Sequence, residues 1–463
     1  MIMRQLMCGF TTLAWVATGA GLAMAQTPAP MPAPAPTTSQ AAPAPMAPPV
    51  TPAPPVAPSA PPTATAPAAT VPAASALPGG EPQAAAPAEG GAPKPKPKKP
   101  APPPRELALS DDPTPTLQPE TFFTTAKASE RYLQIVDRGG WPTVGVSLRP
   151  GAKGPAVVSL RRRLAAEDET LRDVSKTSWD NDLTAAVKRF QFRMGLKQTG
   201  IVAGATLREL DIPANVRFRQ LASSAQRLAG VEFPFGPRYI VVNIPSTSVE
   251  AVDNDKVTRR YAAIVGDPEH HSPEVQAKVY AVNINPTWTV PQSIIKNEIA
   301  PKMLRDPSYL KRSKIRVLNA QGEEIDPRTI NWASERAANY TLRQDSGAGN
   351  SLGSIRISMP NPYSVYMHDT PSRNLFNNDY RFLSHGCVRV QGVVDLAAWL
   401  LDGSHGPTLD KAEIDRRIAT GEREEVRLSQ SVPVIWIYAT GWASADGTVH
   451  FRDDVYHLDE VGE

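Results

Sequence analysis

The spacing of hydrophobic and polar residues changes at about residue 238, and this change separates two kinds of expected structure. After it, short runs rich in Val, Ile and Tyr are separated by Pro and Gly, which is typical of strands in a β-sandwich or barrel. The expected strands cover residues 239–244, 261–265, 279–284, 355–359, 363–367 and 434–438, and a helix is expected at about 392–401. The pattern predicts a mostly β domain over residues 238–445.

Before this point the apolar residues recur at helical spacing. Three stretches predict a small three-helix domain, whose first helix opens at Gly154-Pro155 and whose second begins near Asp180. Proline is tolerated in the first turn of a helix, so Pro155 fits the first start. We expect a multidomain α+β chain. A helical scaffold is expected at residues 105–145, with a helix at 126–137, and it continues at 213–237. The three-helix domain covers residues 146–212, with its third helix at 204–210, a helical and charged insertion interrupts the β domain at about 294–344, and a C-terminal tail covers 446–463.

The first 25 residues have the pattern of a secretory signal peptide. Arg4 supplies one positive charge, residues 6–22 are largely apolar, and Ala23-Met24-Ala25 has the small residues of a cleavage site. The sequence therefore predicts an exported protein of a bacterial periplasm or cell wall. If the signal peptide is cleaved, we expect the chain to contact the membrane only transiently, through that peptide. The alternative is an uncleaved membrane anchor.

Residues 26–104 are expected to be a disordered linker rich in Pro and Ala. They contain 27 of the 49 prolines of the chain and no aromatic residue, so they cannot bury enough apolar surface to offset the entropy of ordering. The segment ends in a lysine-rich run, residues 94–99, for which a solvated spacer is the simplest account. The formal net charge of +3 is too small to indicate nucleic acid, and no nucleic-acid motif accompanies it.

Candidate chemistry centres on Cys387, which is the one cysteine outside the expected signal peptide. An exported protein with a single cysteine has no internal disulfide, and an unpaired thiol is a liability unless it has a task. His385 lies two residues before it, and His368 lies nineteen residues before it. We expect Cys387 on a turn before a helix, where the helix N-terminus would favour the thiolate. The alternative is a buried structural cysteine.

The surrounding residues resemble the signature of the L,D-transpeptidases of bacterial cell walls. The signature consists here of His368-Asp369-Thr370 followed by Ser384-His385-Gly386-Cys387, Val388 and Arg389. Further stretches resemble the long, multidomain branch of this family: 285–291, 350–353 and 360–363. In that branch the insertion is a mobile cap over the active site. The three-helix domain resembles the peptidoglycan-binding module, although Thr199 and Ala203 replace residues that are usual in it.

The resemblance implies a role for each site residue. Cys387 is the expected nucleophile, His368 the general base, and His385 an orienting or substrate-binding residue. Gly386, which has no Cβ to obstruct a substrate, would lie in the backbone of the oxyanion hole. The expected substrate-binding residues are Arg389, Tyr366, Trp288 and Ser384. Arg389 would hold a substrate carboxylate or, alternatively, pair with Asp369.

The reaction implied by the resemblance is the formation of 3→3 peptidoglycan cross-links. Cys387 would attack the third residue of a tetrapeptide stem, release the terminal D-alanine and form a thioester, which the side-chain amine of an acceptor stem then resolves. The expected partners are donor and acceptor stems, with carbapenem-type β-lactams as covalent inhibitors. No metal and no organic cofactor are expected.

Two other functions remain open at this point, and two further classes lack their motifs. An L,D-carboxypeptidase or endopeptidase would use water at the same site, and a non-catalytic wall-binding scaffold would leave the thiol idle. A zinc peptidase lacks the His-Glu-x-x-His and Cys-x-x-Cys patterns of a metal site. A serine hydrolase lacks the Gly-x-Ser-x-Gly elbow.

Overall fold

A computed structural model describes residues 105–168, 170–402 and 408–459, which all belong to one unit. The expected signal peptide and the proline-rich linker lie outside the described residues. Within the described part of the chain, no helix is long and apolar enough to cross a membrane.

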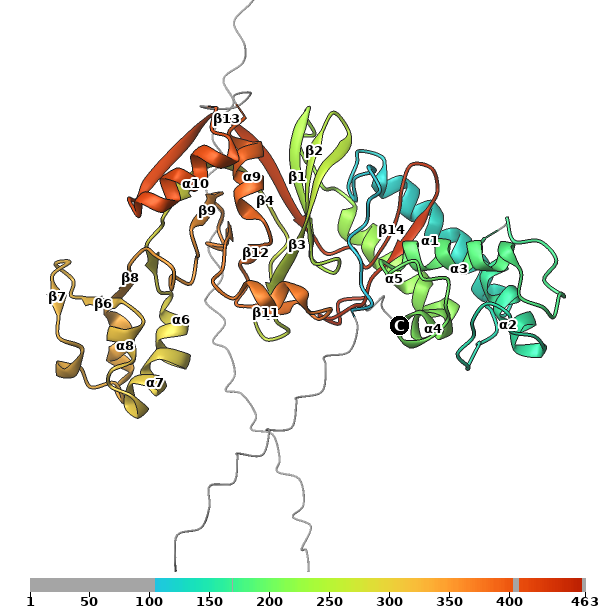
Figure 1. The fold of residues 1–463 in the computed structure, drawn as a ribbon, viewed down its shortest axis with the longest axis horizontal. Coiled ribbons are helices and arrows are strands. Elements are labelled where there is room, and N and C mark those ends of the chain that lie inside the picture. The colour runs from blue at the N-terminus through green and yellow to red at the C-terminus, as the bar shows by residue number, and fades with distance from the viewer. Residues whose placement is uncertain (1–104, 169, 403–407, 460–463) are drawn as a thin grey trace, which may run out of the picture. The chain divides into compact units, whose positions relative to one another are not determined.

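Nine strands form the sheet of the β domain, in the order β11-β3-β12-β10-β9-β4-β13-β1-β2. A further pairing between β2 and β3 closes the sheet into a ring, with β11 attached to β3. The sequence pattern for a β-sandwich or barrel thus corresponds to a closed sheet. The strands are β1 Arg238–Asn243, β2 Ser248–Asp253, β3 Lys256–Gly266, β4 Val275–Ile284, β9 Ile355–Ser358, β10 Met367–His368, β11 Phe382–Ser384, β12 Val388–Val390 and β13 Glu424–Ile437 (Figure 1).

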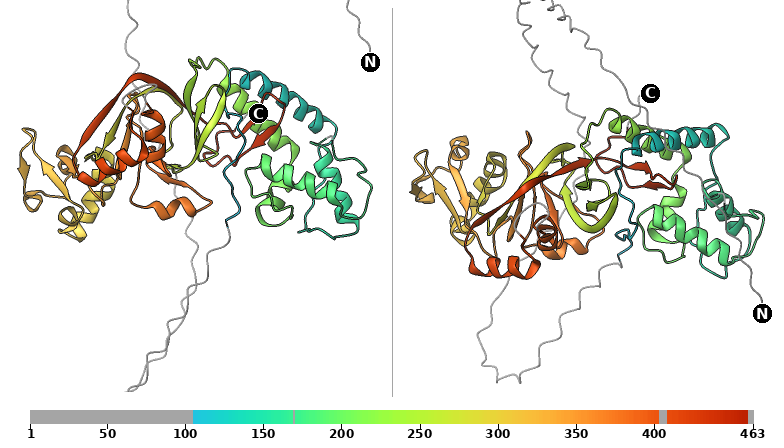
Figure 2. Two further views of the ribbon diagram at one scale, coloured as in Figure 1. Left: turned by 45° about the horizontal axis from the view of Figure 1, so that its top comes forward. Right: turned by 90° about the horizontal axis from the view of Figure 1, so that it is seen from above.

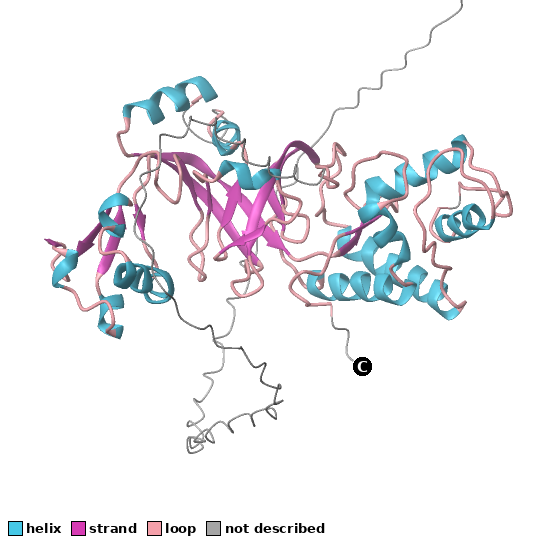
Figure 3. Cartoon of the chain, turned by 60° about the horizontal axis from the view of Figure 1, so that its bottom comes forward, coloured by secondary structure: helices cyan, strands magenta, loops and turns pink. Residues whose placement is uncertain are grey.

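Most of the apolar residues of these strands fill one large core. Helices α9 (Val393–Leu400) and α10 (Lys411–Thr420) add Leu396, Leu400 and Ile414 to it. Helix α9 contacts β9 and α10 contacts β4. Figure 3 shows the strands gathered in the middle of the molecule. The helix predicted at about 392–401 is confirmed.

The insertion after β4 contains the expected helices and, in addition, a four-stranded sheet in the order β5-β8-β6-β7. Its own apolar core includes Ile299, Met303 and Leu342. The charged helical pattern did not indicate these strands, because they are at most four residues long. This insertion, residues 288–344, is called the cap from here on. Its elements are β5 Trp288–Thr289, α6 Gln292–Ile294, a π-helical turn Ile295–Ile299, α7 Ala300–Arg305, α8 Tyr309–Arg312, β6 Ile315–Leu318, β7 Glu324–Ile325, β8 Thr341–Gln344 and the 3-10 turns Pro327–Thr329 and Glu335–Asn339.

Five helices form the region before the β domain: α1 Thr121–Asp137, α2 Pro155–Ala165, α3 Asn181–Arg193, α4 Gly204–Asp211 and α5 Ala214–Leu228. Helix α2 has proline at its N-terminus, and the Asp180 side chain accepts a hydrogen bond from the backbone N–H of Leu183 at the start of α3. Both starts lie where the sequence predicted them. Helix α1 begins five residues before the expected 126, and α1 and α5 lie side by side in both views of Figure 2.

Two expectations about strands and loops were wrong. Residues 446–463 were assigned to a tail, but Val449–Phe451 forms β15, which pairs with β14 (Gly441–Ala443) and packs into the helical core through Phe451. Residues 363–367 were expected to be one strand, but only Met367 of this run is extended in the sheet. The residues just before Met367 form a turn instead, because the Asn361 side chain donates hydrogen bonds to the backbone carbonyls of Met359 and Val365.

A buried ionic network lies inside the three-helix region. Glu167 is enclosed by Arg163, whose Nη1 lies 2.6 Å from its Oε2, by Arg193 and by the hydroxyl of Tyr132 at 2.6 Å from Oε1. These positive and donor groups outweigh the cost of burial and lower the pKa of Glu167 to about 2. Glu167 is therefore ionised at neutral pH.

Candidate active site

The register of two parallel strands places the candidate residues on one face of the sheet. In β10 and β12, Met367 lies opposite Val388 and His368 lies opposite Arg389. Because side chains alternate along a strand, and because Met367 and Val388 are buried in the core, the residues next to them face the other way. A cleft of about 300 Å³ lies on that face. Its lining includes Trp288, Glu298, Lys302, Tyr309, Tyr366, His368, Ser384, His385, Cys387 and Arg389.

Cys387 lies between β11 and β12 and not at the start of a helix. The next helix, α9, begins at Val393, so the expected stabilisation of a thiolate by a helix N-terminus does not apply. The sulfur is largely buried, and burial raises the pKa of the Cys387 thiol. The backbone and hydroxyl of Tyr366 and the charge of Arg389 oppose this effect without cancelling it. At neutral pH Cys387 therefore rests as a thiol.

The turn before Cys387 is held by hydrogen bonds of its own residues. The Ser384 hydroxyl donates to the Cys387 carbonyl at 2.5 Å, and it accepts from the Gly386 N–H at 3.2 Å. Ser384 therefore shapes the turn, and its one donor is used there. The Gly386 N–H is also engaged, whereas the Cys387 N–H makes no hydrogen bond within the described residues.

Gly386 is required at its position for conformational reasons. Its φ is +103°, which favours glycine, and a Cβ there would lie 3.2 Å from the carbonyl oxygen of His271. The Gly386 carbonyl accepts from the Ser272 hydroxyl at 2.8 Å, and the Tyr456 hydroxyl in turn accepts from the Ser272 N–H at 3.1 Å. Neither Ser272 nor Tyr456 was singled out in the sequence, because each lies far from the turn along the chain.

His368 is held in one tautomer by its neighbour in sequence. Its Nδ1 lies 2.5 Å from the backbone carbonyl oxygen of Asp369. A carbonyl only accepts, so Nδ1 carries the proton and Nε2 carries the lone pair. Burial, together with the charge of Arg389, lowers the pKa of His368 to about 4. His368 is therefore neutral at pH 7 and able to accept a proton.

The Asp369 carboxylate is buried behind His368. Its Oδ2 accepts from the Ser354 N–H at 3.1 Å, from the Ser354 hydroxyl at 2.9 Å and from Arg373 Nη2 at 3.0 Å. This settles the alternative for Arg389, since Asp369 pairs with Arg373 instead. Arg389 makes no ion pair with any of the residues that the structure describes, and it lines the cleft.

Tyr366 and Trp288 both lie in the cleft beside the sulfur. The Tyr366 hydroxyl interacts with the Cys387 sulfur and with the Trp288 side chain, and burial with the nearby sulfur raises the pKa of Tyr366. The phenol is therefore protonated and can donate to the sulfur. Tyr366 also makes an edge contact with His368, with ring centroids 5.7 Å apart.

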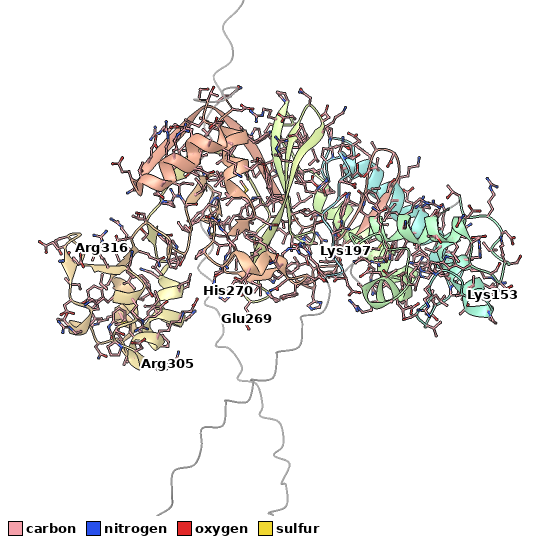
Figure 4. All side chains as sticks on the ribbon, viewed as in Figure 1. Lys153, Lys197, Glu269, His270, Arg305 and Arg316 are labelled. Carbon is pink, nitrogen blue, oxygen red and sulfur yellow. The ribbon has the colours of Figure 1, made fainter. Side chains whose placement is uncertain are left out.

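His385 points to the cap. Its Nε2 lies 2.9 Å from Oε1 of Glu298 on the π-helical turn Ile295–Ile299, and its ring centroid is 4.5 Å from that of His270. Figure 4 labels His270 on the lower side of the β domain, between the labelled cap residues and Lys197. The contact with Glu298 could not be seen in the sequence, because the pair is separated by a long stretch of the β domain. Among the described residues, no group of three or more His, Cys, Asp or Glu is arranged to hold a metal ion.

Comparison of the sequence with known protein families identifies the two domains that the fold shows. Residues 237–414 match the family described as "L,D-transpeptidase catalytic domain", and residues 153–210 match "Putative peptidoglycan binding domain". The β domain therefore matches an L,D-transpeptidase catalytic domain, and the resemblance stated from the motif is confirmed. The mostly β catalytic domain and the helical peptidoglycan-binding domain are confirmed with it.

A curated relative agrees with this assignment over part of its length. The chain is 32% identical over 243 residues to a protein named "Putative L,D-transpeptidase" from Haemophilus influenzae, and the match covers 52% of this chain and 48% of that protein. The chain thus spans about half of the length of this relative.

Solved structures of L,D-transpeptidases are more distant. One from Mycobacterium smegmatis is 15% identical, with 43% of this chain and 58% of that chain covered and a TM-score of 0.21. One from Xylanimonas cellulosilytica is 14% identical, with 64% and 99% covered and a TM-score of 0.20. A third, in complex with imipenem, is 15% identical, with 43% and 59% covered and a TM-score of 0.22.

Proposed function

We propose that this chain is an L,D-transpeptidase that forms 3→3 cross-links between peptidoglycan stems through a thioester on Cys387. The observation that carries the proposal is the strand register. It puts the thiol, a neutral imidazole protonated at Nδ1, and the guanidinium of Arg389 on one face of the sheet, beside a cleft.

The first half of the reaction is acylation of the enzyme. His368 Nε2 takes the proton of the Cys387 thiol as the sulfur attacks the carbonyl of the third stem residue, and a C–S bond forms. The Cys387 N–H donates to the oxyanion. His368 then gives its proton to the leaving nitrogen, the C–N bond breaks, and D-alanine departs. Arg389 binds a carboxylate of the donor stem.

The second half transfers the acyl group to an amine. The acceptor amine attacks the thioester carbonyl, and its proton passes to His368 as the C–N bond forms. The C–S bond breaks, and the sulfur recovers a proton from His368. The cap limits the access of water to the thioester during this interval.

The experiment that tests the proposal follows mass changes on defined tetrapeptide stems. We expect the release of D-alanine, an acyl adduct on the intact protein, and a cross-linked dimer. The variant Cys387→Ala should give none of these while keeping the thermal unfolding curve. Full activity of this variant would remove the nucleophile assignment, and imipenem should add one equivalent to the wild type alone.

Hydrolysis at the same site is the second candidate function. The observation that favours hydrolysis is the partial exposure of Glu298, Lys302 and His385, which leaves this side of the cleft accessible to water. An enzyme of this kind would release tripeptide at the same rate with and without an amine acceptor, whereas a transpeptidase would divert the thioester to the dimer.

The proposed substrate lies outside the cytoplasmic membrane, so the proposal includes export to the periplasm or cell wall. Cell fractionation of the full chain tests it. Recovery of the protein only from the cytoplasm would contradict this part of the proposal without affecting the chemistry.

A further inference from the structure

The cap contributes two charged side chains to the cleft, Glu298 and Lys302. Both oxygens of the Glu298 carboxylate are used, since Oε1 lies 2.9 Å from His385 Nε2 and Oε2 lies 3.0 Å from Lys302 Nζ. A carboxylate only accepts, so His385 Nε2 carries a proton in either charge state of the ring. An acid and a base of the cap are thus held next to the turn that carries Cys387.

These side chains are more accessible than those that orient His368. The relative exposures of the Glu298, Lys302 and His385 side chains are 34%, 38% and 40%, compared with 6% for Asp369. Ion pairs this exposed contribute little to stability. The apolar core of the cap, with Ile299 and Met303, holds the cap together without them. The pair is therefore accessible to a ligand, and the cap does not depend on it for its fold.

The charges of the cleft form two separate groups. Arg389 projects from β12 beside the sulfur, while the carboxylate and ammonium of Glu298 and Lys302 come from the cap. In the proposed reaction Arg389 binds the donor, and a second ligand must then present an amine to the thioester. A carboxylate next to an ammonium complements a ligand that carries an ammonium next to a carboxylate.

We propose that Glu298 and Lys302 form the acceptor subsite, and that this subsite selects an amine whose own carbon carries a carboxylate, as in the side chain of a diaminodicarboxylic acid. The inference rests on the proposed function. Glu298 binds the ammonium, Lys302 binds the carboxylate, and His385 fixes Glu298 against the catalytic turn. The bound ammonium releases one proton to water, and the resulting amine attacks the thioester as described above.

The experiment separates the two halves of the reaction. The full chain is acylated with a tetrapeptide stem, and the thioester is divided between water and one of two soluble probes. D-Methionine carries an amine and a carboxylate on one carbon, and D-methioninamide carries the amine without the carboxylate. Release of D-alanine measures acylation, and the ratio of exchanged tetrapeptide to free tripeptide measures the use of the acceptor.

We expect Glu298→Gln to keep the acylation rate and to lower the use of both probes about tenfold, because a charge-assisted hydrogen bond is lost. Lys302→Gln should remove the preference for D-methionine over D-methioninamide. Glu298→Asp should restore part of the lost transfer. Glu335→Gln is the matched control, since Glu335 pairs with Lys296 on the cap, is 86% exposed and is not among the residues that line the cleft.

Two results would overturn the inference while leaving the proposed function intact. One is an unchanged ratio of transfer to hydrolysis in Glu298→Gln. The other is a parallel loss of acylation and transfer, which would make Glu298 a structural residue of the cap. A wild-type protein that releases no D-alanine would instead remove the proposed function, and this inference with it.

Discussion

His368 and Arg389 lie directly opposite each other on the neighbouring parallel strands β10 and β12. This register brings together the two halves of the motif, which are separated along the chain by the residues between the strands. It also affects the electrostatics, because burial, together with the charge of Arg389, lowers the pKa of the imidazole and keeps it neutral. The cleft therefore holds a neutral base and a protonated thiol at pH 7.

Replacement of the base tests its role. His368→Ala should lower the single-turnover rate of acylation by about 10²- to 10⁴-fold, because the group that accepts the thiol proton is lost. The affinity for the donor should change little. His457→Ala, at an exposed position outside the cleft, is the control. Equal losses of rate and affinity would identify His368 as a structural residue.

The pH dependence follows from the directions of the two pKa shifts. The pKa of His368 is lowered to about 4, so the base is free above this value and acylation should be lost only as the pH falls through about 4. The pKa of Cys387 is raised, so alkylation by iodoacetamide should be slow at pH 7 and should increase as the pH rises. An alkylation rate that is constant from mildly acidic to neutral pH would indicate a thiolate–imidazolium pair instead.

The role of Asp369 in orienting His368 can be tested by a substitution at Gly353, which lies against the Asp369 side chain. A Cβ at Gly353 would lie 2.5 Å from the Asp369 Cβ, so Gly353→Ala should displace Asp369 and with it the carbonyl that orients His368. We expect acylation to fall about 10- to 100-fold. Gly347→Ala is the matched control, because Gly347 also has a positive φ but nothing within 4 Å of the added Cβ. Similar activity losses in both variants would show that only backbone strain matters.

Stability of the helical region should depend on Glu167. Glu167→Gln leaves Arg163 and Arg193 without their buried partner and should cost about 3–5 kcal/mol of unfolding free energy. The folded pKa of Glu167 is about 2, below its ordinary value near 4.5. Its contribution is therefore complete above about pH 4.5 and is lost as the pH falls toward 2. Thermal unfolding as a function of pH measures this, and a variant with the same melting curve as the wild type at pH 7 would contradict it.

The sequence predicted what depends on local spacing. Pro155 marked one helix start because a first-turn proline acts within one helical turn, and helical spacing placed the next start near Asp180, whose side chain caps it in the structure. The motif around Cys387 was sufficient to identify the family, because its signature consists of short runs of neighbouring residues. The strand expected at residues 363–367 was wrong because one side chain, Asn361, competes with the sheet for two backbone carbonyls.

Other features depend on contacts between distant segments and could not be predicted. The thiol was expected to benefit from a helix N-terminus, but the chain forms β12 before α9 begins. Glu298 reaches the site through the cap, and Ser272 through a loop behind the catalytic turn. Neither residue belongs to a local pattern, so only the three-dimensional arrangement identifies them.

The central position of β13 has a consequence for how the enzyme is made. This strand lies between β4 and β1, and it is the last of the nine to leave the ribosome. The earlier strands cannot form a complete ring until residue 437 is available, so closure of the sheet awaits synthesis of its last strand. Such long-range pairing slows folding, and a nascent chain paused before β13 would expose unpaired edges.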